Sequence, residues 1–80
     1  MVDYEYIIEI GRENIDIVNK ITEAYEGIGN VRTLDSKKGI VKILTNKYFL
    51  DDINNMFLKI KEVFNIDIKI ISENEWQGVI

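Results

Sequence analysis

The order in which two hydrophobic periods follow one another is the feature of this chain that most limits its fold. Over residues 4–10 the side chains alternate between an apolar face and a mixed face, which is typical of a half-buried strand. Beyond Gly11 the apolar period lengthens to three or four residues over 13–26, the pattern of a helix with one apolar face. Gly27 then suits the glycine that ends many helices. The start of the chain therefore predicts a strand followed by a helix.

The rest of the chain repeats the two periods in a different order. Two β-branched runs, 31–34 and 40–45, are separated by a loop of turn-forming residues and predict a hairpin. Asn46 can cap a second helix, whose apolar side chains recur at helical spacing over 49–64. Residues 66–72 alternate again, and we expect them to form a fourth strand.

Strand, helix, hairpin, helix and strand, in this order, make up the split βαβ arrangement of ferredoxin-like domains. Right-handed crossovers place both helices on one face of a four-stranded antiparallel sheet with the order 4-1-3-2. We therefore predict a single α+β ferredoxin-like βαββαβ domain over residues 1–72, followed by a C-terminal tail over 73–80. The second face of the sheet is left without a helix.

The residue inventory excludes several kinds of chemistry. The sequence contains no cysteine and no histidine. Disulfides, thiolate metal sites, cysteine nucleophiles and the commonest general base are therefore absent. No phosphate-binding loop or nucleophile motif occurs either. We expect a protein that is not an enzyme and that holds no metal and no cofactor.

Charge and hydropathy limit the partners. Ten basic and fourteen acidic side chains give a net charge of −4, so the average field repels a nucleic-acid backbone. The sequence begins without the pattern of a signal peptide, and no apolar run reaches the ~20 residues of a membrane span. We expect a cytoplasmic location, with neither nucleic acid nor membrane as a partner.

The helix-free face of the predicted sheet lacks aromatic rings, on which such sheets stack the bases of single-stranded RNA. Glu5 and Glu9 can instead face Lys42 and Lys69 on neighbouring strands. Large aliphatic side chains lie between these charges, namely Ile7, Leu34, Ile40, Leu44 and Ile71. A contiguous apolar patch usually marks a partner surface, so we predict a homo-oligomer, most simply a dimer, that buries it.

Trp76 stands in an otherwise polar, acidic segment near the C-terminus. Tryptophan is frequent at the energetic centre of interfaces, so Trp76 can anchor the second copy. In the alternative, the tail with Trp76, Val79 and Ile80 folds over the helix-free face of its own chain. The sequence leaves both alternatives open.

The stretch Gly27–Val31, between a helix and a strand, resembles the corresponding turn of ACT domains, regulatory modules that bind amino acids between paired subunits. The resemblance implies ligand binding at the first strand-to-helix turn and near the start of the second strand. Gly11, Asn14 and Asn30 occupy those positions, although the proline–glycine pair of that family is absent. Arg32 can hold a carboxylate or phosphate with two hydrogen bonds. The simpler interpretation gives the glycines to turns and pairs Arg32 with a glutamate of the next strand.

A second resemblance concerns the same region. The stretch Glu23–Gly27 followed by Val31–Thr33 is similar to the helix end and strand start of a family of short bacterial proteins of unknown function. This similarity implies a size and a fold but no activity.

Taken together, these features predict a binding or regulatory module that senses a small anionic metabolite, such as an amino acid, at a homo-oligomer interface. The alternative is a protein–protein adaptor whose helix-free sheet face meets a different protein without any small ligand. A third interpretation is RNA binding through the lysines near the hairpin tip, Lys37, Lys38 and Lys42. Two adjacent lysines on a turn, however, need only be solvated.

Overall fold

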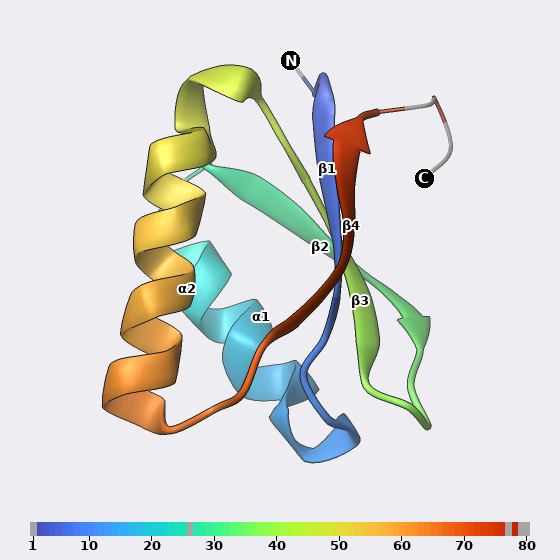
Figure 1. Ribbon diagram of the computed structural model, residues 1–80, viewed down its shortest axis with the longest axis vertical. Helices are drawn as coiled ribbons and strands as arrows, with labels where there is room; N and C mark the ends of the chain where they lie inside the picture. Colours follow the sequence, from blue (N-terminus) through green and yellow to red (C-terminus); the bar gives the residue numbers. More distant parts are fainter. Residues whose placement is uncertain (1, 26, 77, 79–80) are drawn as a thin grey trace.

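The computed structural model describes residues 2–25, 27–76 and 78. The strands are β1 (Tyr4–Glu9), β2 (Gly29–Asp35), β3 (Ile40–Thr45) and β4 (Lys69–Glu75), and the helices are α1 (Ile15–Ala24) and α2 (Leu50–Phe64). Short 3-10 turns, η1 (Arg12–Asn14) and η2 (Lys47–Phe49), precede the two helices. The sheet has the order β2-β3-β1-β4, and all neighbouring strands are antiparallel. Both helices lie on one side of it (Figure 1), so the predicted ferredoxin-like α+β arrangement is confirmed.

The second helix begins and ends where its polar residues predict. The Asn46 side chain accepts a hydrogen bond from the backbone N–H of Tyr48 at 2.8 Å, so it caps the short turn that leads into α2. Asp51 and Asp52 lie in the first turn of α2, where carboxylates complement the positive end of the helix dipole. Asn65 adopts a left-handed conformation with φ 56° and ends the helix.

The first helix is shorter than predicted. The prediction was a helix over 13–26, whereas α1 spans Ile15–Ala24. The first two residues of the predicted helix belong to the separate turn η1. Gly27 has φ 80° but lies beyond the last helical residue. Strand β2 begins at Gly29, two residues earlier than the predicted 31–34. The start of β2 differs from the prediction because its backbone pairs with β3 as far as Gly29. The residue pattern of one strand does not reveal this pairing.

The fourth strand is displaced toward the C-terminus. β4 ends at Glu75, so three residues of the predicted tail over 73–80 belong to the sheet. Ile7 pairs with Ser72, whereas Ile8 pairs with Ile70, and Ile71 is therefore the extra residue of a β-bulge. The bulge changes which side of the sheet each later residue occupies.

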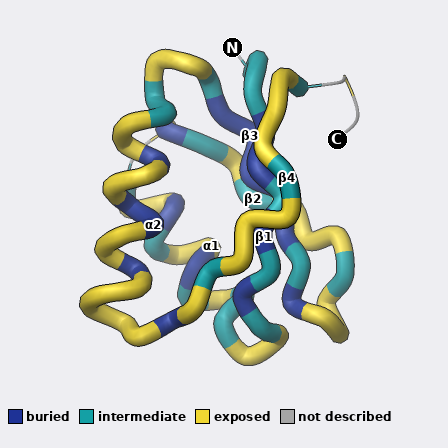
Figure 2. The backbone as a smooth tube through the Cα atoms, viewed as in Figure 1, coloured by how far each residue is buried: buried dark blue, intermediate teal, exposed yellow. Residues whose placement is uncertain are grey.

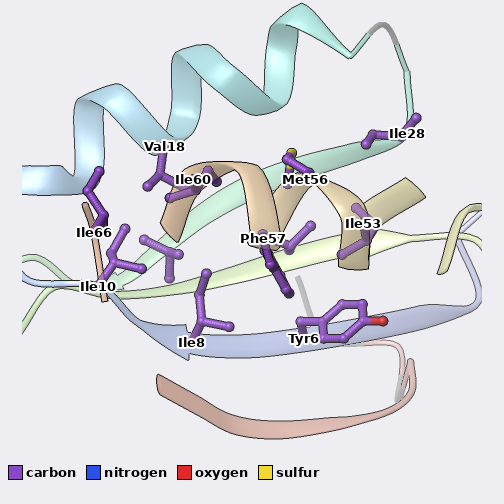
Figure 3. Packing of buried hydrophobic residues seen from close by; sticks show 12 residues of the cluster. Tyr6, Ile8, Ile10, Val18, Ile28, Ile53, Met56, Phe57, Ile60 and Ile66 are labelled. Carbon is purple, nitrogen blue, oxygen red and sulfur yellow. The ribbon is translucent and has the colours of Figure 1, made fainter. Parts of the chain in front are cut away.

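The core fills the space between the sheet and the two helices (Figure 3). Tyr6 and Ile8 from β1 are buried beneath Ile53 and Ile60 of α2 and the other core side chains. The rings of Tyr6 and Phe57 meet edge to face, with centroids 5.4 Å apart. The helix-facing residues expected from the alternation of the first strand are therefore those that form the core.

The hairpin between β2 and β3 packs directly against the turn after β1. The N–H of Ile10 donates a hydrogen bond to the carbonyl oxygen of Gly39 at 2.9 Å. A Cβ on Gly39 would lie 2.2 Å from the carbonyl carbon of Gly11, which no side chain tolerates. Gly39 also has φ 70°, so glycine is required there for both reasons.

Candidate functional site

The ligand residues predicted from the sequence lie in two separate places. Asn30 pairs with Leu44 of β3, and Leu44 pairs in turn with Glu5 of β1. Gly11 is six positions beyond Glu5 in the sequence, which corresponds to about 20 Å of extended chain at ~3.3 Å per residue. Gly11 and Asn14 are therefore at one end of the sheet, whereas Asn30 is at the other.

The turn after β1 uses its own polar groups. The Asn14 side-chain amide donates to the carbonyl oxygen of Ile10 at 2.8 Å, and its backbone N–H donates to that of Gly11 at 3.0 Å. Gly11 has φ 87°, and a Cβ there would come within 2.8 Å of a carboxylate oxygen of Glu13. These contacts explain Gly11 and Asn14 as turn residues without a ligand.

Asn30 and Arg32, by contrast, line one polar cleft between α1 and β2. The cleft has a volume of about 220 Å³ and is lined by Asn19, Thr22, Glu23, Gly29, Asn30, Val31 and Arg32. Its charged groups are the guanidinium of Arg32 and the carboxylate of Glu23, and both residues are exposed. The cleft thus combines a cation, an anion and two primary amides.

The expected pairing of Arg32 with a strand glutamate is not the pairing seen in the sheet. The strand glutamate Glu5 pairs with Lys42, whose Nζ atom lies 3.6 Å from a carboxylate oxygen of Glu5. The side chains of Lys42 and Glu5 are both 8% exposed, so this predicted cross-strand pair is confirmed as a buried one. Arg32 donates from Nη1 to the carbonyl oxygen of Val31 at 3.2 Å. This exposed contact leaves the guanidinium at the rim of the cleft.

The five aliphatic residues of the predicted interface do not form one exposed patch. Leu44 is only 3% exposed, and Ile7 and Ile40 are half-buried. Leu34 and Ile71 are each 47% exposed, but they belong to β2 and β4, the two opposite edges of the sheet. Three of the five side chains are therefore buried or half-buried. The exposed apolar surface on which the oligomer prediction was based is smaller than expected. The oligomer itself stays a prediction.

Trp76 continues the pairing of β4 by one residue. Its backbone N–H donates to the carbonyl oxygen of Asp3 at 3.1 Å, and the residue is half-buried. Next to this contact, Lys47 Nζ lies 2.7 Å from a carboxylate oxygen of Glu75. The hydrogen bond to Glu75 raises the pKa of Lys47. Val79 and Ile80, which in the alternative interpretation cover the sheet together with Trp76, lie outside the described residues.

An apolar groove that sequence reasoning missed separates α2 from β4. It has a volume of about 260 Å³ and is lined by Asn54, Phe57, Leu58, Lys61, Ile68 and Ile70. Leu58 is 55% exposed and Ile70 44% exposed, although both are large aliphatic residues. Figure 2 shows the outer side of α2 and much of β4 as exposed. Leu58 lies outside the buried stripe of α2. A large apolar residue at such a position was the sign of this groove in the sequence.

A third cleft lies between the start of α1 and the hairpin. It has a volume of about 450 Å³ and is lined by Arg12, Ile15, Asp16, Thr33, Ser36 and Lys37. The backbone N–H groups of Lys37 and Lys38 both donate to Asp35 Oδ1 at 3.0 Å, which fixes the hairpin tip. The lysines are exposed, as expected for solvated turn residues.

Within residues 2–25, 27–76 and 78, acidic side chains form no group of three that is able to hold a metal ion. No helix in this part of the chain is both long enough and apolar enough to cross a membrane. Burial, with a smaller contribution from the nearby carboxylate of Glu73, raises the pKa of Tyr6 to about 12. The phenol is a core group and stays protonated at neutral pH.

Comparison with known proteins identifies a family. A family model described as a domain of unknown function (DUF4911) matches residues 8–62, which is more than half of the chain. Neither the curated proteins nor the solved structures contain a significant match. The family match agrees with the predicted similarity to short proteins of unknown function, whereas the resemblance to ACT domains stays a prediction.

Proposed function

The chain belongs to the DUF4911 family, a domain of unknown function, and from its polar cleft we propose that it binds a small zwitterionic metabolite of the amino-acid class. The observation that carries this proposal is that Asn30 and Arg32, both selected from the sequence, line one cleft with Asn19 and Glu23. The proposed activity is binding without catalysis. Gly11 and Asn14 are not part of the proposed site.

The chemistry of the cleft complements an amino acid. The planar guanidinium of Arg32 can donate two hydrogen bonds to an α-carboxylate, whereas the carboxylate of Glu23 attracts an α-ammonium group. The amides of Asn19 and Asn30 can each donate and accept, so they suit polar atoms of either kind. A ligand with only one charge would leave either Arg32 or Glu23 without a counter-charge.

Size and exposure indicate a small and weakly held ligand. The volume of about 220 Å³ is below the ~300–1,000 Å³ of pockets for drug-sized ligands. Arg32 and Glu23 are exposed, and exposed ion pairs contribute about 0–1 kcal/mol each. We expect a Kd of roughly 1 mM, which corresponds to about −4 kcal/mol. Such an affinity suits a sensor of an abundant metabolite.

The test is a titration of the full chain with a panel of amino acids, followed by amide NMR. Shifts should cluster at Asn19, Glu23, Asn30 and Arg32, and acetate or methylamine alone should cause smaller ones. Arg32→Met should weaken binding by up to about fivefold, because an exposed ion pair contributes up to about 1 kcal/mol. Arg12→Met, which removes the same charge from the third cleft, is the matched control and should leave the affinity unchanged.

Two outcomes would contradict the proposal. Shifts confined to the cleft of Arg12 and Lys37 would move the ligand to the start of α1. A silent panel would favour the alternative function, an adaptor that meets a different protein through the helix-free face of its sheet.

A further inference from the structure

Most of the exposed large hydrophobic side chains belong to two neighbouring elements, α2 and β4. Among the described residues the full set is Leu34, Tyr48, Leu58, Val63, Phe64, Ile70 and Ile71. Leu58 and Ile70 line the groove between these two elements, and Phe57 adds a third apolar side chain. β4 is an edge strand, so in the described part of the chain no further strand pairs with its outer edge.

The residues of α2 along this groove have the spacing of a helix–helix seam. Asn54, Leu58 and Lys61 line the groove, and Asp51 lies one turn before Asn54 on the same face. Positions 51, 54, 58 and 61 follow one another at intervals of three, four and three residues, as the a and d positions of a coiled coil do. The seam therefore runs along the exposed face of α2 and not along its buried stripe.

The seam is symmetric in position and opposite in charge about Met56. Position 51 is as far from residue 56 as position 61, and position 54 as far as position 58. An antiparallel copy of α2 would thus place Asp51 of one chain opposite Lys61 of the other, twice in each dimer. Leu58 of each chain would lie opposite Asn54 at the partner's groove, over Phe57 and Ile70.

We infer that α2 and the groove beside β4 form the docking surface for a second copy of this chain, with the two α2 helices antiparallel. The occupant is a second copy because the charge complementarity is internal to one helix and is satisfied by a two-fold axis that crosses the exposed seam at the level of residue 56. A partner of another kind would need an opposite charge order by coincidence. β4 and β2 are opposite edges of the sheet, so this surface is independent of the ligand cleft beside β2.

The test is a charge swap measured by sedimentation velocity over a concentration series of the full chain. Asp51→Lys and Lys61→Asp, each alone, place like charges opposite one another twice, and each should weaken the dimer about tenfold or more. The double variant restores opposite charges and should recover most of the wild-type dimer affinity. Leu58→Ala should also weaken the dimer, because it removes the apolar contact with the partner's groove.

The chain offers a matched control. Asp52 and Lys59 carry the same charges in the same two regions of α2, but they lie off the seam. Asp52→Lys alters the first turn of α2 as Asp51→Lys does, Lys59→Asp makes the same charge change as Lys61→Asp, and both should leave the dimer intact. Thermal melting of every variant followed by circular dichroism reports any loss of folding separately.

Three results would overturn the inference. The first is a wild-type chain that sediments as a monomer at every concentration. The second is a double variant that dimerises no better than the single variants. The third is a control pair that weakens the dimer as much as the seam pair does.

Discussion

Replacing Gly39 by alanine should cost this domain a large part of its stability, and Gly27→Ala provides the matched control. Both glycines have positive φ, at 70° and 80°, so each alanine takes on the left-handed penalty of about 1–2 kcal/mol. Around Gly27 nothing lies within 4 Å of the added Cβ, whereas at Gly39 it would meet the Gly11 carbonyl carbon at 2.2 Å. The hairpin tip must therefore move away from the turn after β1.

The displacement of the hairpin adds to the conformational penalty. The hydrogen bond from Ile10 N–H to the Gly39 oxygen would be lost, at about 0.5–1.5 kcal/mol. With the lost packing, we expect a total of about 3 kcal/mol, against about 4–12 kcal/mol for a domain of this length. Gly27→Ala should cost about 1 kcal/mol.

Urea denaturation followed by circular dichroism measures both variants. With an m value of about 1–1.5 kcal/mol/M, Gly39→Ala should lower the midpoint by about 2–3 M and Gly27→Ala by less than about 1 M. Equal midpoints for the two variants would show that the contact between Gly39 and Gly11 contributes nothing. Close approach of the backbone would then not be the reason for glycine at position 39.

Two further predictions concern buried polar groups. Because the pKa of Tyr6 is raised from 10.0 to about 12, the folded state keeps its phenolic proton longer than the unfolded chain. Stability should be complete below pH 10 and fall by roughly 2–3 kcal/mol between pH 10 and 12, and Tyr6→Phe should remove this part of the loss in denaturation measured against pH. Lys42→Met should destabilise by about 3 kcal/mol, because it leaves Glu5 as a buried charge without its lysine partner. Lys47→Met, at the exposed pair with Glu75, should cost less than about 1 kcal/mol by the same denaturation assay, and a larger loss would contradict the distinction by burial.

The fold was predictable because each element shows one clear period. The alternation around Tyr6 and Ile8 and the helical stripe through Ile53 and Ile60 are both produced by burial on one side, and burial is what the structure confirms. The bulge at Ile71 was not predictable, since Ile70 and Ile71 are both apolar and either can occupy the helix side. The register of a strand depends on the strand with which it pairs. The residues of one strand alone do not determine that pairing.

The candidate sites were less predictable than the fold. Asn30 and Arg32 were selected one by one, but their common cleft with Glu23 depends on how α1 lies beside β2. Leu44 was expected to be exposed because its face has no helix, whereas its own neighbours leave it 3% exposed. Sequence periodicity assigns a side chain to a face, but the exposure of that face depends on the side chains around it.

The β-bulge at Ile71 also determines which side chain at the end of β4 lies beside Lys47. If the same residues paired without the bulge, Asn74, and not Glu75, would lie opposite Tyr4. The ammonium group of Lys47, in the turn before α2, would then meet an uncharged amide in place of the carboxylate 2.7 Å away. The bulge thus sets the register that brings Glu75, at the end of β4, beside Lys47, in the turn between β3 and α2.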